Sequence, residues 1–256
     1  MAAASPAFAG CVILTYHSIS EGTSPLKIAP RLFAEQIEWL RSNARVAPLE
    51  EVVDYLAESK PLPARTVVLT FDDGFADFYT HAAPVLKQAH MPAVVFLPTA
   101  FCGGTNRWPG QPGWVEEQPL MSWGQVSELA EAGFSFGSHT VTHPDLSIVR
   151  EPALEHEIAG SKSEIEQQTG REVKFFCYPY GHFNDQARQS VSRHYRAACS
   201  THTAMLGAAV DRFALPRVDA HLVRHPALFR NLFALPFPVY LAARRLVRQI
   251  RGIETY

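Results

Sequence analysis

Short apolar runs alternate along the chain with longer segments in which apolar residues recur at helical spacing. The short runs are five or six residues long, are rich in β-branched and aromatic residues, and are bounded by turn-forming or charged residues. Runs that are apolar at nearly every position are typical of strands buried on both faces. The expected strands cover residues 12–16, 66–71, 93–97, 134–138, 173–178 and 196–200.

The segments between these runs predict amphipathic helices. In residues 30–43, Phe33, Ile37 and Leu40 lie at i, i+4 and i+7, so that one face of the helix is apolar. A glycine follows two of the segments where a helix C-cap is expected, at Gly133 and Gly170. The other expected helices cover residues 49–58, 76–88, 123–132, 152–169 and 184–194.

The repeated order of strand, helix and strand indicates the fold class. Such alternation produces parallel strands with helices outside them, and right-handed crossovers leave either a doubly wound sheet or a barrel. About seven such units, without a GxGxxG motif or a P-loop, favour the barrel. In such a barrel the functional groups follow the carboxyl ends of the strands.

Composition narrows the function classes. Hydrophobic residues make up 47% of the 256 residues, which is enough for a large core without disulfides or a structural metal. The formal net charge is −2, so we expect no nucleic-acid partner. The four cysteines form no CxxC pair and are expected to be reduced. The N-terminus lacks the basic region and long apolar segment of a secretory signal, which predicts an unprocessed, cytoplasmic chain.

Charge is unevenly distributed along the chain. From Arg212 onward there are eight Arg and no Lys against Asp219 and Glu254, about +6, which leaves about −8 for the preceding part. The segment from Leu228 to Ile250 mixes apolar residues with arginines, and Pro236 and Pro238 are expected to break its middle. It is therefore too interrupted to span a bilayer.

These observations divide the chain into a barrel, residues 1–225, and a basic amphipathic tail, residues 226–256. One interpretation of the tail is an anchor on anionic lipid at the inner face of the membrane, or a helix that docks on a partner such as a synthesis complex. The other is a terminal helix that packs on the barrel and exposes its arginines to water.

Two motifs at strand ends carry the candidate chemistry. Residues 70–74, Thr-Phe-Asp-Asp-Gly, place Asp72 and Asp73 directly after a strand, where two buried carboxylates need a shared cation or proton. After another strand, His139 and His143 are four residues apart and can reach one ion.

One carboxylate and two imidazoles leave a divalent ion with open positions, as in hydrolytic zinc sites and unlike closed structural ones. Bound zinc lowers the pKa of its water from about 15.7 to about 7. If one aspartate holds the ion, the other is free to act as a base.

Three motifs follow one another in the order of a known family. They lie at residues 70–74, 139–144 and 178–181, and the last one is Tyr-Pro-Tyr-Gly. The chain resembles the polysaccharide deacetylases of carbohydrate esterase family 4, also called the NodB homology domain, from about Cys11 to His221. The resemblance implies a distorted (β/α)7 barrel that removes acetyl groups from N-acetylated sugars.

The resemblance also implies roles for individual residues. Asp72 would be the general base, and Asp73, His139 and His143 would hold one divalent ion. Zinc is the first expectation for this ion, with cobalt or nickel as alternatives. The groove would be lined by Pro179, Tyr180 and Gly181, with the Tyr180 N–H helping to stabilise the oxyanion.

Two positions depart from the family pattern. The third motif usually begins with an arginine that orients the catalytic aspartate, and here that position is Cys177. Our hypothesis is that Arg217 supplies the guanidinium from a late strand; the alternative is an ordinary surface arginine.

The family's late Leu-x-His motif, whose histidine contributes the general acid, also cannot be identified in this sequence. The candidates are His17 and His221. We prefer His17, because deacetylases that resemble those acting on poly-N-acetylglucosamine exopolysaccharides carry a Tyr-His pair after the first strand.

The predicted function is therefore metal-dependent removal of N-acetyl groups from N-acetylhexosamine residues of a polysaccharide or oligosaccharide. Two alternatives remain at this point. One is a deacylase of a small or lipid-linked amide with the same mechanism, and the other is a non-catalytic relative that binds carbohydrate.

Overall fold

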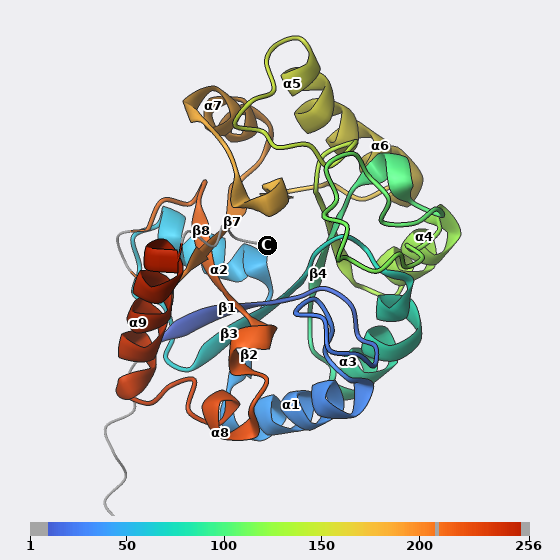
Figure 1. Cartoon of the computed structure of the whole chain (residues 1–256). Coiled ribbons are helices and arrows are strands. Elements are labelled where there is room, and N and C mark those ends of the chain that lie inside the picture. Colours follow the sequence, from blue (N-terminus) through green and yellow to red (C-terminus); the bar gives the residue numbers. More distant parts are fainter. Residues whose placement is uncertain (1–9, 208–209, 252–256) are drawn as a thin grey trace, which may run out of the picture.

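The computed structural model describes residues 10–207 and 210–251, with side chains in the last helix described as far as Val247. Seven parallel strands close into a barrel, because β1 pairs with both β3 and β8. Helices surround the strands (Figure 1). The barrel strands, in their order around it, are β1 (Cys11–Tyr16), β3 (Thr66–Phe71), β4 (Val94–Leu97), β5 (Ser135–Ser138), β6 (Phe175–Cys177), β7 (Ala197–Thr203) and β8 (Leu215–Asp219). The predicted (β/α)7 barrel is confirmed.

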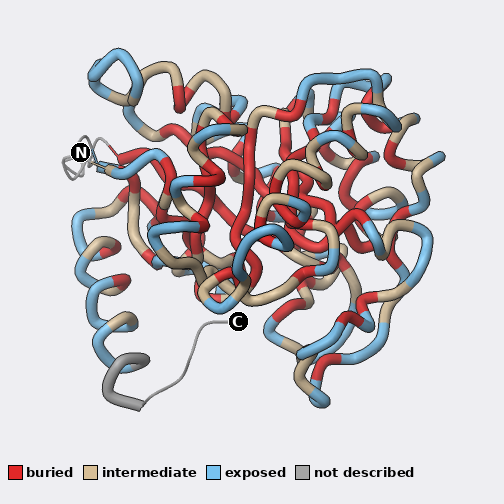
Figure 2. Tube along the Cα trace, turned by 90° about the horizontal axis from the view of Figure 1, so that it is seen from above, coloured by how far each residue is buried: buried red, intermediate tan, exposed pale blue. Residues whose placement is uncertain are grey.

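Alternation along the strands separates two apolar clusters. In β1, Val12 and Leu14 pack with the surrounding helices, whereas Cys11 and Ile13 point into the barrel. Helix α2 (Leu49–Ala57) belongs to the interior cluster and covers that end of the barrel. Buried residues accordingly gather in the middle of the molecule and exposed ones at its rim (Figure 2).

Further along the strands the inward positions become polar. Thr15 continues the inward alternation of β1, and Thr70 and Asp72 continue that of β3 beyond Val68. The Thr15 and Thr70 hydroxyls lie 3.3 Å apart. The period of two therefore produces an apolar barrel at one end and a polar chamber at the carboxyl ends of the strands.

Most expected elements occur close to their predicted bounds, and Gly133 and Gly170 adopt the positive φ angles, 95° and 64°, that a C-cap needs. Strand β2, which pairs with β3 outside the ring, was not predicted because two residues show no period. The helices that match the predictions are α1 (Pro30–Asn43), α2, α4 (Trp123–Glu131) and α7 (Asp185–His194); β2 covers Arg45–Val46.

Two expected helices are subdivided. Residues 76–88 form a π-helical turn, η1 (Phe78–Ala82), followed by α3 (Ala83–Ala89). Pro84 has no N–H for an α-helical bond, and the Ala83 N–H donates to the Phe78 carbonyl five residues earlier. Residues 152–169 are likewise divided, into α5 (Ala153–Glu155), η3 (His156–Gly160) and α6 (Ser161–Thr169).

The expected interruption is present but lies just before the prolines: residues 230–235 form turns and the next helix begins at Pro236. Both prolines lie in the first turn of α9 (Pro236–Arg251), where a missing N–H leaves no helical bond unmade. Phe237 and Leu241 join the main core, and α9 follows the short helix α8 (Pro226–Phe229).

In the described part of the chain, no helix has the length and apolar character that crossing a membrane requires. One face of α9 packs on the barrel, as one interpretation of the tail expects. Residues 1–9, which carry the prediction of an unprocessed N-terminus, and residues 252–256 of the tail lie outside the described ranges.

Candidate active site

The polar chamber forms a pocket at the carboxyl ends of the strands. Within the described chain, seven of the nine predicted site residues line it, and Pro179 and Gly181 adjoin Tyr180 without doing so. The general-acid candidate His17 is among the lining residues, whereas His221 is not. The pocket is lined by Thr15, His17, Asp72, Asp73, His139, His143, Tyr178, Tyr180, Ser200, Thr201, Thr203, Arg217 and Asp219.

Asp73, His139 and His143 form a compact cluster of potential metal ligands. One oxygen of Asp73 lies 3.5 Å from Nε2 of His139 and 3.4 Å from Nε2 of His143. Each residue offers a ligand atom, and these atoms all lie within 4.8 Å of one another. One carboxylate and two imidazoles at such separations suit a single divalent ion with open coordination positions.

The ring of His139 is oriented for this role. Its Nδ1 lies 2.7 Å from the Cys177 carbonyl oxygen, to which it donates as N–H, so that Nε2 presents its lone pair toward Asp73. Burial, reinforced by neighbouring His143, lowers the pKa of His139 to about 4. His139 is therefore neutral at pH 7, as metal ligation requires. The cluster thus fits the predicted metal.

The loop between the two histidines is held by a buried carboxylate. Glu157, in η3, accepts the backbone N–H groups of Val141 and Thr142, both at 2.8 Å, and the Thr142 hydroxyl at 2.6 Å. His143 has a φ of 58°, which a β-carbon makes unfavourable. Glu157 therefore stabilises a strained turn that brings both imidazoles to Asp73.

Asp72 forms a bidentate ion pair with Arg217. Its carboxylate oxygens lie 2.7 and 2.6 Å from the two terminal guanidinium nitrogens, and both side chains are at most 5% exposed. Burial by itself would raise the pKa of Asp72, but the charge and hydrogen bonds of Arg217 outweigh it and hold the pKa well below its ordinary value. Asp72 is therefore ionised at neutral pH.

Three further acceptors hold the Arg217 guanidinium. Its Nε donates to the Ser200 carbonyl at 2.9 Å, and its terminal nitrogens lie 3.3 Å from the Thr70 hydroxyl and 3.1 Å from Cys177 Sγ. The small thiol thus occupies the position of the family's usual arginine and contacts the guanidinium that comes from β8. Burial keeps the pKa of Cys177 well above its ordinary value, so it remains a neutral thiol.

Tyr180 lies in a tight turn that glycine completes. Tyr180 has a φ of 57° and Gly181 a φ of 73°. A β-carbon on Gly181 would lie 1.9 Å from the Thr201 hydroxyl oxygen, so this position accepts no side chain. The turn keeps the Tyr180 ring against His143, with ring centroids 4.7 Å apart.

The segment after His17 is held on both sides. Asp77 accepts the Ser18 hydroxyl at 2.5 Å and the Ile19 N–H at 2.9 Å, and His81 Nδ1 lies 2.8 Å from the Ile19 carbonyl. His221 lies instead in η5 (Ala220–Val223), where its backbone N–H is capped by Asp219.

Sequence reasoning did not identify Glu157 or the contacts of Cys177. Glu157 lies 14 residues after His143 in a segment with no motif. The one feature of the sequence that could have identified it is an acidic residue on the apolar face of an expected helix, where the structure shows it buried. Trp108, in the segment between β4 and α4, packs against His143 with ring centroids 4.2 Å apart and is 3% exposed.

Comparisons with known proteins agree with this geometry. The chain is 28% identical to the poly-β-1,6-N-acetyl-D-glucosamine N-deacetylase of Staphylococcus epidermidis over 192 residues, 69% of this chain and 62% of that one. It is 29% identical over 209 residues to YxkH of Bacillus subtilis, which is named for polysaccharide deacetylation, covering 80% of this chain and 70% of that one.

Solved structures share the fold. The Streptococcus pyogenes deacetylase PplD, in complex with acetate, is 28% identical with a TM-score of 0.71, covering 83% of this chain and 92% of that one. IcaB from Ammonifex degensii is 26% identical with a TM-score of 0.73, covering 90% and 97%. The family model for polysaccharide deacetylases matches residues 59–197, more than half of the chain. The chain belongs to the polysaccharide deacetylase family.

Proposed function

We propose that this protein hydrolyses the N-acetyl groups of N-acetylglucosamine residues in a polysaccharide, with one divalent metal ion as cofactor. The observation that carries the proposal is the placement of an ionised, arginine-paired Asp72 beside the Asp73, His139 and His143 cluster in one pocket. The relatives named as poly-β-1,6-N-acetyl-D-glucosamine N-deacetylases support this polymer as the substrate.

Asp73, His139 and His143 would hold the ion, and zinc is the first choice because mixed nitrogen and oxygen ligands suit it. When bound, the ion supplies Lewis acidity that polarises the acetamide carbonyl and acidifies water. Cobalt and nickel accept the same donors.

The protein's own groups carry the proton transfers. Asp72, ionised beside Arg217, accepts a proton from the water whose oxygen bonds to the acetamide carbon. The Tyr180 N–H would donate to the oxyanion that forms. His17, in its protonated form, then gives a proton to the sugar nitrogen as the carbon–nitrogen bond breaks, leaving acetate and a free amino sugar.

The test is acetate release from β-1,6-linked N-acetylglucosamine oligomers by protein that has been stripped of metal and reconstituted with single ions. We expect release that requires metal and that Asp73→Asn abolishes. Asp145→Asn, which changes a partly exposed aspartate paired with His182 at 3.0 Å, is the matched control.

Two outcomes would overturn parts of the proposal. Activity only on small or lipid-linked amides would overturn the polymer as substrate and leave the reaction standing. Metal binding without hydrolysis of any amide would favour a non-catalytic carbohydrate-binding protein.

A further inference from the structure

The exposed apolar side chains of this protein are concentrated near its C-terminus. Of the six large hydrophobic residues exposed in the described chain, four lie within residues 235–247. These four are Leu235 at 55% exposure, Val239 at 69%, Leu246 at 57% and Val247 at 44%. The clustering indicates a surface with a binding role, since single exposed apolar residues are ordinary but a contiguous group is not.

Within helix α9, Val239 and Leu246 lie on the side opposite the packed face, and Leu235 directly precedes the helix. Phe237 and Leu241 are buried in the core, at 3% and 2% exposure. At 100° per residue, Val239 and Leu246 are separated by about 20° around the helix and lie roughly opposite Phe237. The outer face of α9 is therefore an apolar stripe over two turns.

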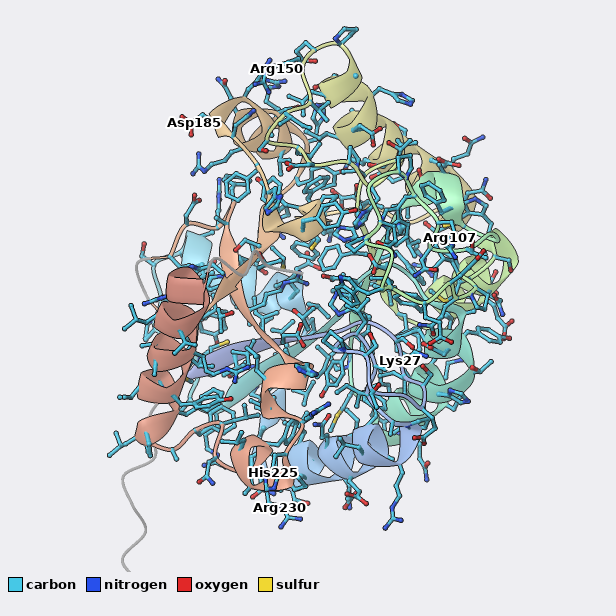
Figure 3. The ribbon with its side chains drawn as sticks, in the orientation of Figure 1. Lys27, Arg107, Arg150, Asp185, His225 and Arg230 are labelled. Atoms are coloured by element: carbon cyan, nitrogen blue, oxygen red, sulfur yellow. The ribbon has the colours of Figure 1, made fainter. Side chains whose placement is uncertain are left out.

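The segment of sequence that carries the stripe is positively charged, although Arg244, seven residues after Phe237, lies on the other side of α9 from Leu246. Residues 220–253 contain six Arg and no Lys, Asp or Glu. Arg224, Arg230 and Arg244 are exposed in the structure. Figure 3 shows Arg230 and His225 at the outer edge of the molecule next to α8. A partner of this surface must accept apolar side chains and carry negative charge.

We propose that the outer face of α9, aided by the net positive charge of residues 220–253, docks on the surface of a bilayer that contains anionic lipids. Such a helix inserts its apolar side chains at the boundary of headgroups and acyl chains, while nearby arginines are attracted to the anionic surface. A second copy of the chain fits less well, because it would bring like charges together with no acidic residue of residues 220–253 to pair with them.

The position of α9 gives this docking a consequence for the pocket. Arg245 lies 3.1 Å from Nε2 of His202, and the neighbours of His202, Thr201 and Thr203, both line the pocket. The Tyr240 hydroxyl donates to the Leu222 carbonyl, just beyond the carboxyl end of β8. α9 thus packs at the pocket end of the barrel, and docking would place the pocket close to the lipid surface.

The test is co-sedimentation of the full chain with vesicles of phosphatidylcholine alone and of phosphatidylcholine mixed with phosphatidylglycerol. We expect binding to the mixed vesicles, weaker at high salt because exposed charges are screened. Arg230→Gln with Arg244→Gln should weaken partitioning by about 25-fold, or about fivefold for each arginine. Val239→Ser with Leu246→Ser should also weaken it.

A matched control removes an apolar residue and an arginine elsewhere. Ile148→Ser with Arg150→Gln changes a residue that is 72% exposed and an exposed arginine at the edge of the molecule away from α8 (Figure 3). This variant should bind vesicles like the unmodified protein. Thermal unfolding of every variant establishes that it is folded.

Three results would overturn the proposal. One is equal sedimentation with neutral and mixed vesicles, and another is equal binding by the α9 variants and the control. The third is a dimer, measured without lipid, that Val239→Ser with Leu246→Ser dissociates; the apolar stripe would then be an interface between copies.

Discussion

Replacing Arg217 by methionine tests the pairing at the centre of the site. The change removes the guanidinium and leaves Asp72 buried, with its side chain 5% exposed. Removing one partner of a buried ion pair reduces the free energy of unfolding by about 3–5 kcal/mol, because the other charge stays buried without compensation. The two short bonds, 2.7 and 2.6 Å, place this pair among the well-formed ones.

The measurement is equilibrium unfolding in guanidinium chloride with a chelator present, so that metal binding does not contribute. Arg188→Met is the control, because Arg188 and Asp211 form an ion pair at 2.7 Å whose side chains are 40% and 39% exposed. That change should reduce the free energy of unfolding by less than about 1 kcal/mol.

A double variant separates loss of charge pairing from loss of packing. Asp72→Asn with Arg217→Met leaves no buried ion, so it should unfold at a higher denaturant concentration than Arg217→Met alone. The reasoning about this pair is refuted if Arg217→Met destabilises the protein no more than Arg188→Met. It is also refuted if adding Asp72→Asn to Arg217→Met lowers the free energy of unfolding further.

The same pair predicts a pH dependence of stability. Since the pKa of Asp72 is lower in the folded protein than in the unfolded chain, the stabilisation is fully present above the unfolded value of about 3.9. It is lost as the pH falls through the depressed folded value. The difference in stability between the unmodified protein and Arg217→Met should therefore be larger near neutral pH than in acid.

The remaining predictions concern the acid, the histidine turn and the glycine. His17→Ala should lower turnover by roughly 10²- to 10⁴-fold with metal content unchanged, while His221→Ala stays active; the reverse result in acetate-release kinetics would transfer the role. Glu157→Ala leaves two backbone N–H groups unpaired, so it should lower the free energy of unfolding by about 1–3 kcal/mol. It should also weaken the affinity for zinc measured by titration, and an unchanged affinity would refute its positioning role. Gly181→Ala should abolish acetate release by contact with Thr201, whereas Gly133→Ala, with no atom within 4 Å of the added carbon, should retain it; equal activities would refute the steric argument.

The chain's local patterns were sufficient for the fold class and for most of the candidate site. Strand runs and helical periods define the repeating units, and the two motifs follow strands directly, so parallel strands bring Asp73 and His139 to the same end of the barrel. Pro236 shows the limit of such patterns: the interruption occurs as expected, but both prolines belong to the first turn of the following helix, and the sequence alone did not say where that helix begins.

The contact between Asp72 and Arg217 was decided by tertiary structure. The two residues are 145 positions apart. They meet because β1 pairs with β3 on one side and with β8 on the other, so that closure brings the first and last barrel strands around one chamber. Closure also places His17 on the pocket and leaves His221 outside its described lining. Local periodicity specifies which face of a strand is buried, whereas the neighbours across that face depend on how the whole sheet closes.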